Sequence, residues 1–147
     1  MELTENEIPE MLQSFYLSFG RWMRYQYKSL KGKDVLTLPQ FQVLFIIGNL
    51  EICNMSSLSE VMEVSKGTMT CMLNKLVEED YVERKSCVKD RRNVYVSLTE
   101  KGNKKVKEIR TRLLETITIE LEGLEEDARQ QVHQGLEILS NIFKGKK

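Results

Sequence analysis

Residues 57–79 have the sequence SLSEVMEVSKGTMTCMLNKLVEE, and this stretch decides the fold. Ser57-Leu58-Ser59-Glu60 has the form of a capping box, which satisfies two unpaired backbone donors at a helix start. Ser65 is a second N-cap residue, and it predicts a helix that reaches about Glu79. The apolar positions of that helix are expected to face inward: Met69, Met72, Leu73, Leu76 and Val77. Two short helices with a tight turn near residues 63–65 predict a helix-turn-helix.

A basic hairpin is predicted directly after this helix pair. Residues 81–84 and 93–98 alternate apolar and polar side chains, which is typical of half-buried strands. Four cations lie within eight residues between the alternating segments: Lys85, Lys89, Arg91 and Arg92. An arginine on a projecting hairpin can enter a DNA minor groove, where the narrow width concentrates negative potential. We expect Asp90 to hold a neighbouring arginine through a charge-assisted hydrogen bond.

Two helices are predicted on the N-terminal side of this central region. The first covers residues 5–31 and carries its apolar side chains at spacings of three and four. The second begins at Thr37, an N-cap residue followed by Pro39 in the first turn, and reaches about Ile47. Apolar side chains cover most of the circumference of the second helix, so we expect it to lie at the centre of the fold.

Two further helices are predicted on the C-terminal side. Thr99 caps a long helix that runs to about Glu122, Gly123 ends it, and a last helix follows. The first helix and the last two each have an apolar face without an obvious partner in the central region. This favours a dimer interface built from both ends of the chain. The predicted fold is mainly α with a small antiparallel β wing.

The charges balance overall but are distributed unevenly. The chain has 147 residues and 41% apolar content, enough for one domain with a core. Its 22 Lys and Arg residues cancel its 22 Asp and Glu residues. Residues 81–107 nevertheless carry nine basic against three acidic side chains, a net charge of +6. Such a local block provides a phosphate-binding surface on an otherwise neutral molecule.

Several functional classes find no support in the sequence. The N-terminal segment is acidic and polar, unlike a signal peptide, and the longest apolar run, residues 43–47, is too short to span a bilayer. Three cysteines without a CxxC pair (Cys53, Cys71 and Cys87) favour a cytoplasmic protein with reduced thiols. With His133 as the only histidine, we expect no metal site. No phosphate loop or nucleophile motif is present, so we expect neither a cofactor nor an enzyme.

Six ordered segments together resemble the MarR family of winged-helix transcriptional regulators. They lie in order over about residues 36–110: Leu36–Leu44, Leu58–Met62, Val64–Thr70, Tyr81–Arg84, Asp90–Arg92 and Val96–Gly102. The resemblance implies a homodimer joined by its terminal helices, which binds double-stranded DNA at a pseudo-palindromic operator. It also implies that the helix from Ser65 to Glu79 enters the major groove, while the wing reaches the minor groove with Arg92 near its tip.

The sequence departs from the family pattern on this helix. Members often have an arginine where this chain has Cys71, and Ser or Pro where it has Gly67. We therefore expect the wing to supply a larger share of the DNA affinity than the helix does. The predicted DNA-binding residues lie on both elements: Ser65, Lys66, Gly67, Thr68, Thr70, Cys71, Asn74, Lys75, Arg84, Lys85, Lys89, Asp90, Arg91 and Arg92.

The resemblance also implies a division of labour along the chain. Residues 1–147 form a single domain, in which 35–107 are the winged helix-turn-helix and 1–34 with 108–147 are dimerisation helices. Family members commonly bind a small aromatic or anionic effector between these parts. Arg21, Trp22, Tyr25 and Phe45 are candidates to line that pocket, although an aromatic stripe at helical spacing is also typical of a plain core.

The predicted function is therefore a ligand-responsive transcriptional repressor. Two alternatives stay open from the sequence. One is a redox-controlled regulator in which oxidation of Cys71 or Cys87, both beside expected DNA contacts, blocks binding. The other is a winged-helix module that binds a protein and no longer binds DNA, which the neutral total charge favours.

Overall fold

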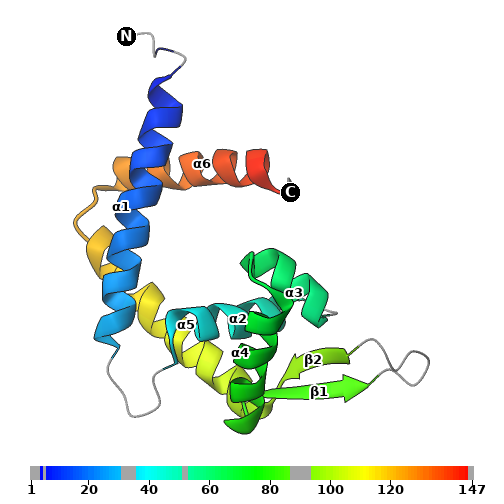
Figure 1. Cartoon of the computed structure of the whole chain (residues 1–147). Helices are drawn as coiled ribbons and strands as arrows, with labels where there is room; N and C mark the ends of the chain where they lie inside the picture. Colours follow the sequence, from blue (N-terminus) through cyan, green and yellow to red (C-terminus); the bar gives the residue numbers. More distant parts are fainter. Residues whose placement is uncertain (1–3, 5, 31–35, 51–52, 87–93, 146–147) are drawn as a thin grey trace. The chain divides into compact units, whose positions relative to one another are not determined.

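The computed structural model describes residues 4, 6–30, 36–50, 53–86 and 94–145 (Figure 1). Within these residues the chain forms six helices and one two-stranded sheet: α1 (Glu7–Ser29), α2 (Leu38–Asn49), α3 (Met55–Met62), α4 (Lys66–Glu78), β1 (Val82–Ser86), β2 (Val94–Leu98), α5 (Glu100–Leu121) and α6 (Glu126–Phe143). This confirms the prediction of a mainly α fold with a small β wing. The chain divides into two compact units, Met1–Leu113 and Leu114–Lys147.

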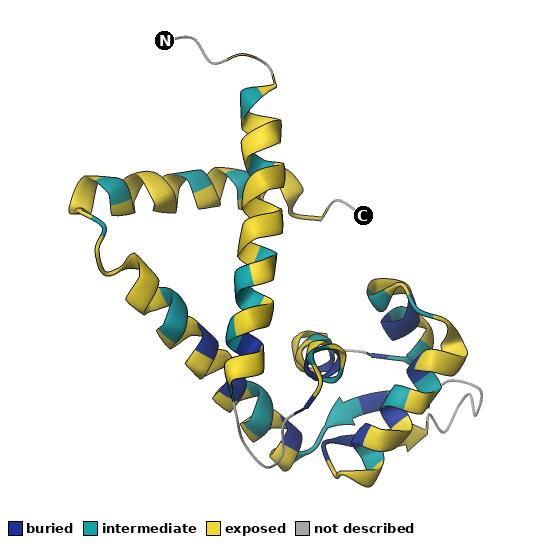
Figure 2. Cartoon of the chain, turned by 60° about the vertical axis from the view of Figure 1, so that its left-hand side comes forward, coloured by how far each residue is buried: buried dark blue, intermediate teal, exposed yellow. Residues whose placement is uncertain are grey.

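The core of the first unit lies between α2, α3, α4 and the wing. Its fully buried side chains come from all of these elements: Val43, Leu44, Cys53, Leu58, Met69, Leu73, Leu76 and Val82. Figure 2 colours the buried segments of the chain dark blue. Ile109 and Leu113 of α5 and Tyr27 of α1 extend the same cluster. Four apolar side chains of α2 are buried, which agrees with the central position predicted for this helix.

Three of the predicted helix starts have the expected side-chain caps. The Thr37 hydroxyl accepts a hydrogen bond from the Gln40 backbone N–H, and the Gln40 side chain accepts one from the Thr37 N–H at 2.8 Å. Ser65 Oγ accepts a bond from Thr68 N at 3.1 Å at the start of α4. Thr99 Oγ1 accepts one from Gly102 N at 3.0 Å at the start of α5. Each cap satisfies a backbone donor that has no partner inside its helix.

The predicted start of α3 at Ser57 is wrong. The helix begins at Met55, and Asn54 is its N-cap, with Oδ1 accepting from Ser57 N at 2.8 Å. The physical reason lies outside the helix. Asn54 forms a bridge with Tyr95 of β2, and Val96 N donates to the Cys53 carbonyl at 2.9 Å. This pairing holds Asn54 extended, the conformation that an N-cap residue needs.

The wing is an antiparallel pair that runs from Val82↔Leu98 to Ser86↔Val94. Its strands lie within two residues of the predicted ones. The wing joins α5 closely, because a Cβ on Gly102 would collide with the backbone carbonyl oxygen of Tyr81. Only glycine fits at this point without a shift of the backbone.

The second unit buries almost none of its apolar side chains. No residue of α6 is buried, although the helix is amphipathic. Leu136, Ile138 and Phe143 are 54%, 60% and 55% exposed. Within the described residues, no helix is both long enough and apolar enough to cross a membrane.

Candidate nucleic-acid interface

A three-residue turn sets the angle at which α4 leaves α3. Glu63 adopts a left-handed conformation (φ 52°, ψ 40°) and ends α3. Val64 N then donates to the Ser59 carbonyl at 3.1 Å, and Ser65 is extended. The turn confirms the predicted helix-turn-helix. It leaves the N-terminus of α4 at the protein surface, where the first-turn N–H groups and the helix dipole favour a phosphate.

Most of the predicted DNA contacts on α4 lie at the surface. Lys66, Gly67, Cys71, Asn74 and Lys75 are exposed, while Met69, Leu73 and Leu76 on the opposite side are buried. Small and polar groups at the surface of such a helix are able to approach base edges.

Three predicted DNA contacts on α4 have hydroxyl groups that are already engaged within the protein. Ser65 Oγ and Thr68 Oγ1 share a hydrogen bond of 2.9 Å. Thr70 is half-buried, and its hydroxyl donates to the Lys66 carbonyl at 2.8 Å and contacts Met55 Sδ at 3.2 Å. The two lysines and the Asn74 amide are therefore the main polar groups that α4 presents.

The base of the wing is tied to α4 by a side-chain hydrogen bond. Arg84 on β1 is exposed, and its Nη2 donates to Asn74 Oδ1 at 2.5 Å. The next residue, Lys85, forms an ion pair with Glu83 at 3.0 Å. Hydrogen bonds from Lys85 and Ser97 and the charge of Lys85 hold the pKa of Glu83 below its usual range. Arg84 thus contacts α4, whereas the charge of Lys85 is partly neutralised by Glu83 on the same strand.

The tip of the wing lies outside the described residues. This applies to four of the predicted DNA contacts (Lys89, Asp90, Arg91 and Arg92) and to Cys87. Their predicted roles stay predictions.

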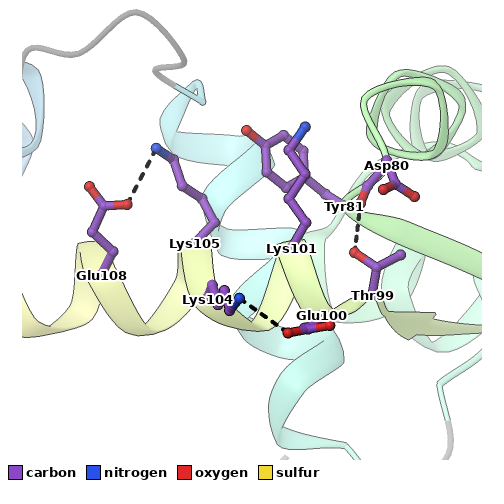
Figure 3. A pocket seen from close by; sticks show the side chains of 8 residues that line it. All are labelled: Asp80, Tyr81, Thr99, Glu100, Lys101, Lys104, Lys105 and Glu108. Carbon is purple, nitrogen blue, oxygen red and sulfur yellow. Dashed lines mark hydrogen bonds and ion pairs between the residues drawn. The ribbon is translucent and has the colours of Figure 1, made fainter.

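Part of the basic block has partners within the chain. Figure 3 shows a shallow hollow at the start of α5 where three lysines meet partners from the same chain. Lys101 Nζ lies 4.4 Å from the ring centroid of Tyr81 and donates to the Glu79 carbonyl at 2.6 Å. Lys104 pairs with Glu100 at 3.1 Å, and Lys105 with Glu108 at 3.7 Å. Glu100 is already counted in the net charge of residues 81–107 but Glu108 is not, so the pairing of Lys105 with Glu108 lowers the charge that this block offers to phosphate.

The two described cysteines differ in environment. Cys71 is exposed on α4, whereas Cys53 is buried. Burial raises the pKa of the Cys53 thiol to about 11, so this group stays protonated and unreactive at neutral pH. His133 on α6 lies 3.7 Å from Glu137 at the surface. Among the described residues no group of three or more His, Cys, Asp or Glu side chains is placed to hold a metal ion.

The four predicted effector residues do not surround one hollow. Arg21 and Tyr25 are exposed on α1, and Trp22 stacks on Phe19 with ring centroids 5.9 Å apart. Phe45 lines a shallow hollow between α2 and α3. Another hollow, of about 330 Å³, is lined by residues of α1, α2 and α5: Tyr16, Leu17, Gly20, Met23, Arg24, Tyr27, Leu38, Phe41, Gln42 and Leu113.

This hollow was missed because α1 has two stripes at helical spacing. Two of the predicted candidates, Trp22 and Tyr25, continue the aromatic stripe of Phe15 and Phe19. The neighbouring stripe, at positions 16, 20, 23 and 27, has a similar spacing of four, three and four. Its end at Tyr27, whose hydroxyl donates to the Leu36 carbonyl at 2.8 Å, is the one place where α1 is buried. Periodicity alone does not distinguish the two stripes.

The fold and the exposed face of α4 define a class of protein. A helix-turn-helix followed at once by a two-stranded wing is the architecture of winged-helix DNA-binding proteins, in which the second helix enters the major groove. Comparisons with known proteins identify the family within that class. The family model described as "MarR family" matches residues 36–94.

Curated relatives and a solved structure agree with this match. The organic hydroperoxide resistance transcriptional regulator of Bacillus subtilis is 32% identical over 103 residues, which cover 67% of this chain and 70% of the relative. SarZ of Staphylococcus aureus, an HTH-type transcriptional regulator, is 40% identical over 88 residues, or 60% of this chain and 59% of the relative. The crystal structure of Streptococcus pneumoniae FabT in complex with DNA has the same fold, with a TM-score of 0.72 at 24% identity, covering 98% of this chain and 100% of FabT.

The chain therefore belongs to the MarR family and is a DNA-binding transcriptional regulator, not an enzyme.

Proposed function

We propose that this regulator acts as a homodimer that binds one pseudo-palindromic operator and represses transcription by occupying it. The exposed polar face of α4 beside the wing carries the proposal, because it gives each protomer one surface that fits a half-site. The DNA-facing set comprises Lys66, Gly67, Cys71, Asn74 and Lys75 with the wing cations. Ser65, Thr68 and Thr70 support the start of α4, and the Lys66 and Gly67 backbone N–H groups, which precede the first intrahelical bond, are the donors proposed to bind phosphate.

The dimer would be built from the two ends of the chain. The apolar side chains of α1 and α6 support this, since Ile8, Met11 and Phe15 are 55%, 69% and 54% exposed and no residue of α6 is buried. Apolar faces of this size are typical of protein interfaces. Residues 35–107 would then bind DNA, and residues 1–34 and 108–147 would hold the two protomers together.

A small aromatic or anionic effector would control the affinity for DNA. The hollow between α1 and α2 supports this proposal, because it combines aromatic walls with the Arg24 guanidinium and the Gln42 amide. A ligand that binds one spacing of the two recognition helices better than the other shifts the dimer toward that spacing. If the favoured spacing does not match the operator, the two half-sites are no longer engaged together.

The first test is selection of bound duplexes from a random library with the reduced, purified protein. The proposal predicts enrichment of an inverted repeat with half-sites about one helical turn apart. Binding that is weak, sensitive to salt and without sequence preference would contradict it and favour the protein-interaction alternative.

A charge-matched pair of variants then tests the wing. Arg92→Ala is expected to weaken operator binding by about 1–3 kcal/mol, if this arginine enters a groove. Lys107→Ala removes the same charge from an exposed position on α5 outside the proposed surface and should leave the affinity nearly unchanged. Equal losses in the two variants would show a general charge effect instead of a wing contact.

A further inference from the structure

The hydrogen bond between Arg84 and Asn74 fixes which way the Asn74 amide points. Arg84 Nη2 lies 2.5 Å from Asn74 Oδ1, and both side chains are at the surface. A guanidinium group has five donors and no acceptor, so only the carbonyl oxygen of the amide is able to face it. The NH2 group of Asn74 must therefore point away from Arg84. A bond to a charged donor is also stronger than one between neutral groups, which holds this orientation.

Asn74 occupies a stripe on which α4 is able to approach DNA closely. Gly67, Cys71 and Asn74 follow one another at spacings of four and three, so they lie on one side of the helix. All three are exposed. The glycine and the cysteine are small, which leaves the Asn74 amide as the longest polar group of this stripe. Glu78 comes next on the same side, and its charge disfavours phosphate beyond that point.

We propose that Arg84 is a positioning residue that fixes the Asn74 amide with its NH2 group toward one base in each half-site. An unconstrained asparagine is able to turn either end of its amide toward a base. Arg84 holds Oδ1 on its own side, so the NH2 group is the end that faces outward. An NH2 donor fits a base with a major-groove acceptor, which guanine, adenine and thymine have, whereas cytosine presents only its N4 donor there. The operator therefore excludes cytosine opposite Asn74.

This inference rests on the proposed operator binding, and the same duplex selection tests it with four proteins. The wild type should exclude cytosine at one position in each half-site. Arg84→Ala allows the amide to turn Oδ1 toward the base, so the discrimination against cytosine at that position should fall by about tenfold. Asn74→Asp keeps an acceptor for Arg84 but has no donor, so it should select cytosine, whose N4 is a major-groove donor. Lys107→Ala removes a charge outside the proposed DNA surface and should leave the base preference unchanged.

The salt dependence of binding distinguishes positioning from a direct phosphate contact. If Arg84 acts through Asn74, the slope of log K against log salt should be the same in Arg84→Ala as in the wild type. Adding Arg84→Ala to Asn74→Ala should change no base preference. A uniform loss of affinity for all sequences, with a slope reduced by about one, would overturn the inference.

The possible failures are distinguishable. If the wild type selects an inverted repeat but Arg84→Ala selects the same bases, only this inference falls. If the wild type selects no repeat, the operator proposal and the inference fall together. Circular dichroism of each variant checks folding, which these exposed substitutions should leave intact.

Discussion

The helix-turn-helix with its wing and the last helix, α6, treat similar apolar side chains in opposite ways. Leu58, Leu73 and Leu76 in the first region are fully buried within the chain. Leu136 in α6 is 54% exposed, although its helix is just as clearly amphipathic. Figure 2 shows the same contrast, with buried segments on the central elements and none along α6.

The difference shows which part of the protein carries its own core. A buried leucine contributes about 1.5–3 kcal/mol relative to an exposed one, so the first region obtains this stabilisation inside one chain. The apolar stripe of α6 does not obtain it within its own unit, because no residue of α6 is buried. The contrast supports the proposed division into a DNA-binding part and terminal helices that would pair with a second copy.

The largest expected effect is the difference in stability between truncating a leucine in the core and truncating one in α6. Leu73→Ala leaves a cavity in the core and should lower the free energy of unfolding by about 2–5 kcal/mol. Leu136→Ala removes an exposed side chain and should cost about 0.5 kcal/mol or less at low protein concentration. Urea unfolding followed by circular dichroism measures both. Losses of similar size would mean that α6 is as well covered as the core.

Alanine substitutions at two glycines compare a tightly packed position with an open one inside the first unit. Gly102→Ala places a Cβ against the Tyr81 carbonyl and should lower stability by about 1–3 kcal/mol, because the backbone must move. In Gly67→Ala the nearest atom to the new Cβ is Ser65 Oγ, at 3.9 Å, so nothing opposes the higher helix propensity of alanine and the stability should rise by up to about 1 kcal/mol. Thermal unfolding of the pair is the measurement. Tolerance of alanine at 102 would contradict the tight joint between the wing and α5.

Tyr27 is an intermediate case, because it is the one buried residue of α1. Burial raises its pKa from the usual 10 to about 12 in the folded protein. The folded chain therefore retains a proton that the unfolded chain loses, so the stability from Tyr27 is complete below pH 10 and declines as the pH rises toward 12. Tyr27→Phe should cost about 1 kcal/mol at pH 8 by removing the bond to the Leu36 carbonyl.

The same variant should also flatten the decline in stability above pH 10, which urea midpoints at pH 8 and 10.5 would show. A wild type and variant with parallel pH profiles would mean that Tyr27 titrates normally.

The smallest effect is expected in the turn before α4. Glu63 has a positive φ of 52°, so Glu63→Gly should raise the free energy of unfolding by about 0.5–1 kcal/mol. Glu60→Gly, in the interior of α3, should lower it by about 1 kcal/mol, since glycine is a poor helix former. Opposite signs in the same assay are the expected result. A loss at position 63 would show that the Glu63 side chain stabilises the turn.

The sequence by itself determined the order of the elements and most of their ends. Thr37, Ser65 and Thr99 were predicted as caps and form them, because a cap depends on the backbone N–H three residues ahead. The buried face of α4 was also correct, since the spacing of its apolar residues specifies one side of a helix. These features depend on neighbours within about one helical turn, and such neighbours are close together in the sequence.

Where the sequence offered several equivalent caps or hydrogen-bond partners, only the tertiary structure decided which of them is used. Asn54 replaced Ser57 as the cap because its segment pairs with a strand some forty residues later. Lys101 was counted among the charges expected to bind phosphate, but it donates to the Glu79 carbonyl, 22 residues away in sequence. Arg84 reached Asn74 across ten residues and thereby oriented an amide whose two ends look alike in the sequence. Each outcome depends on where the chain returns in space, and the path of the chain is set by packing of the whole core.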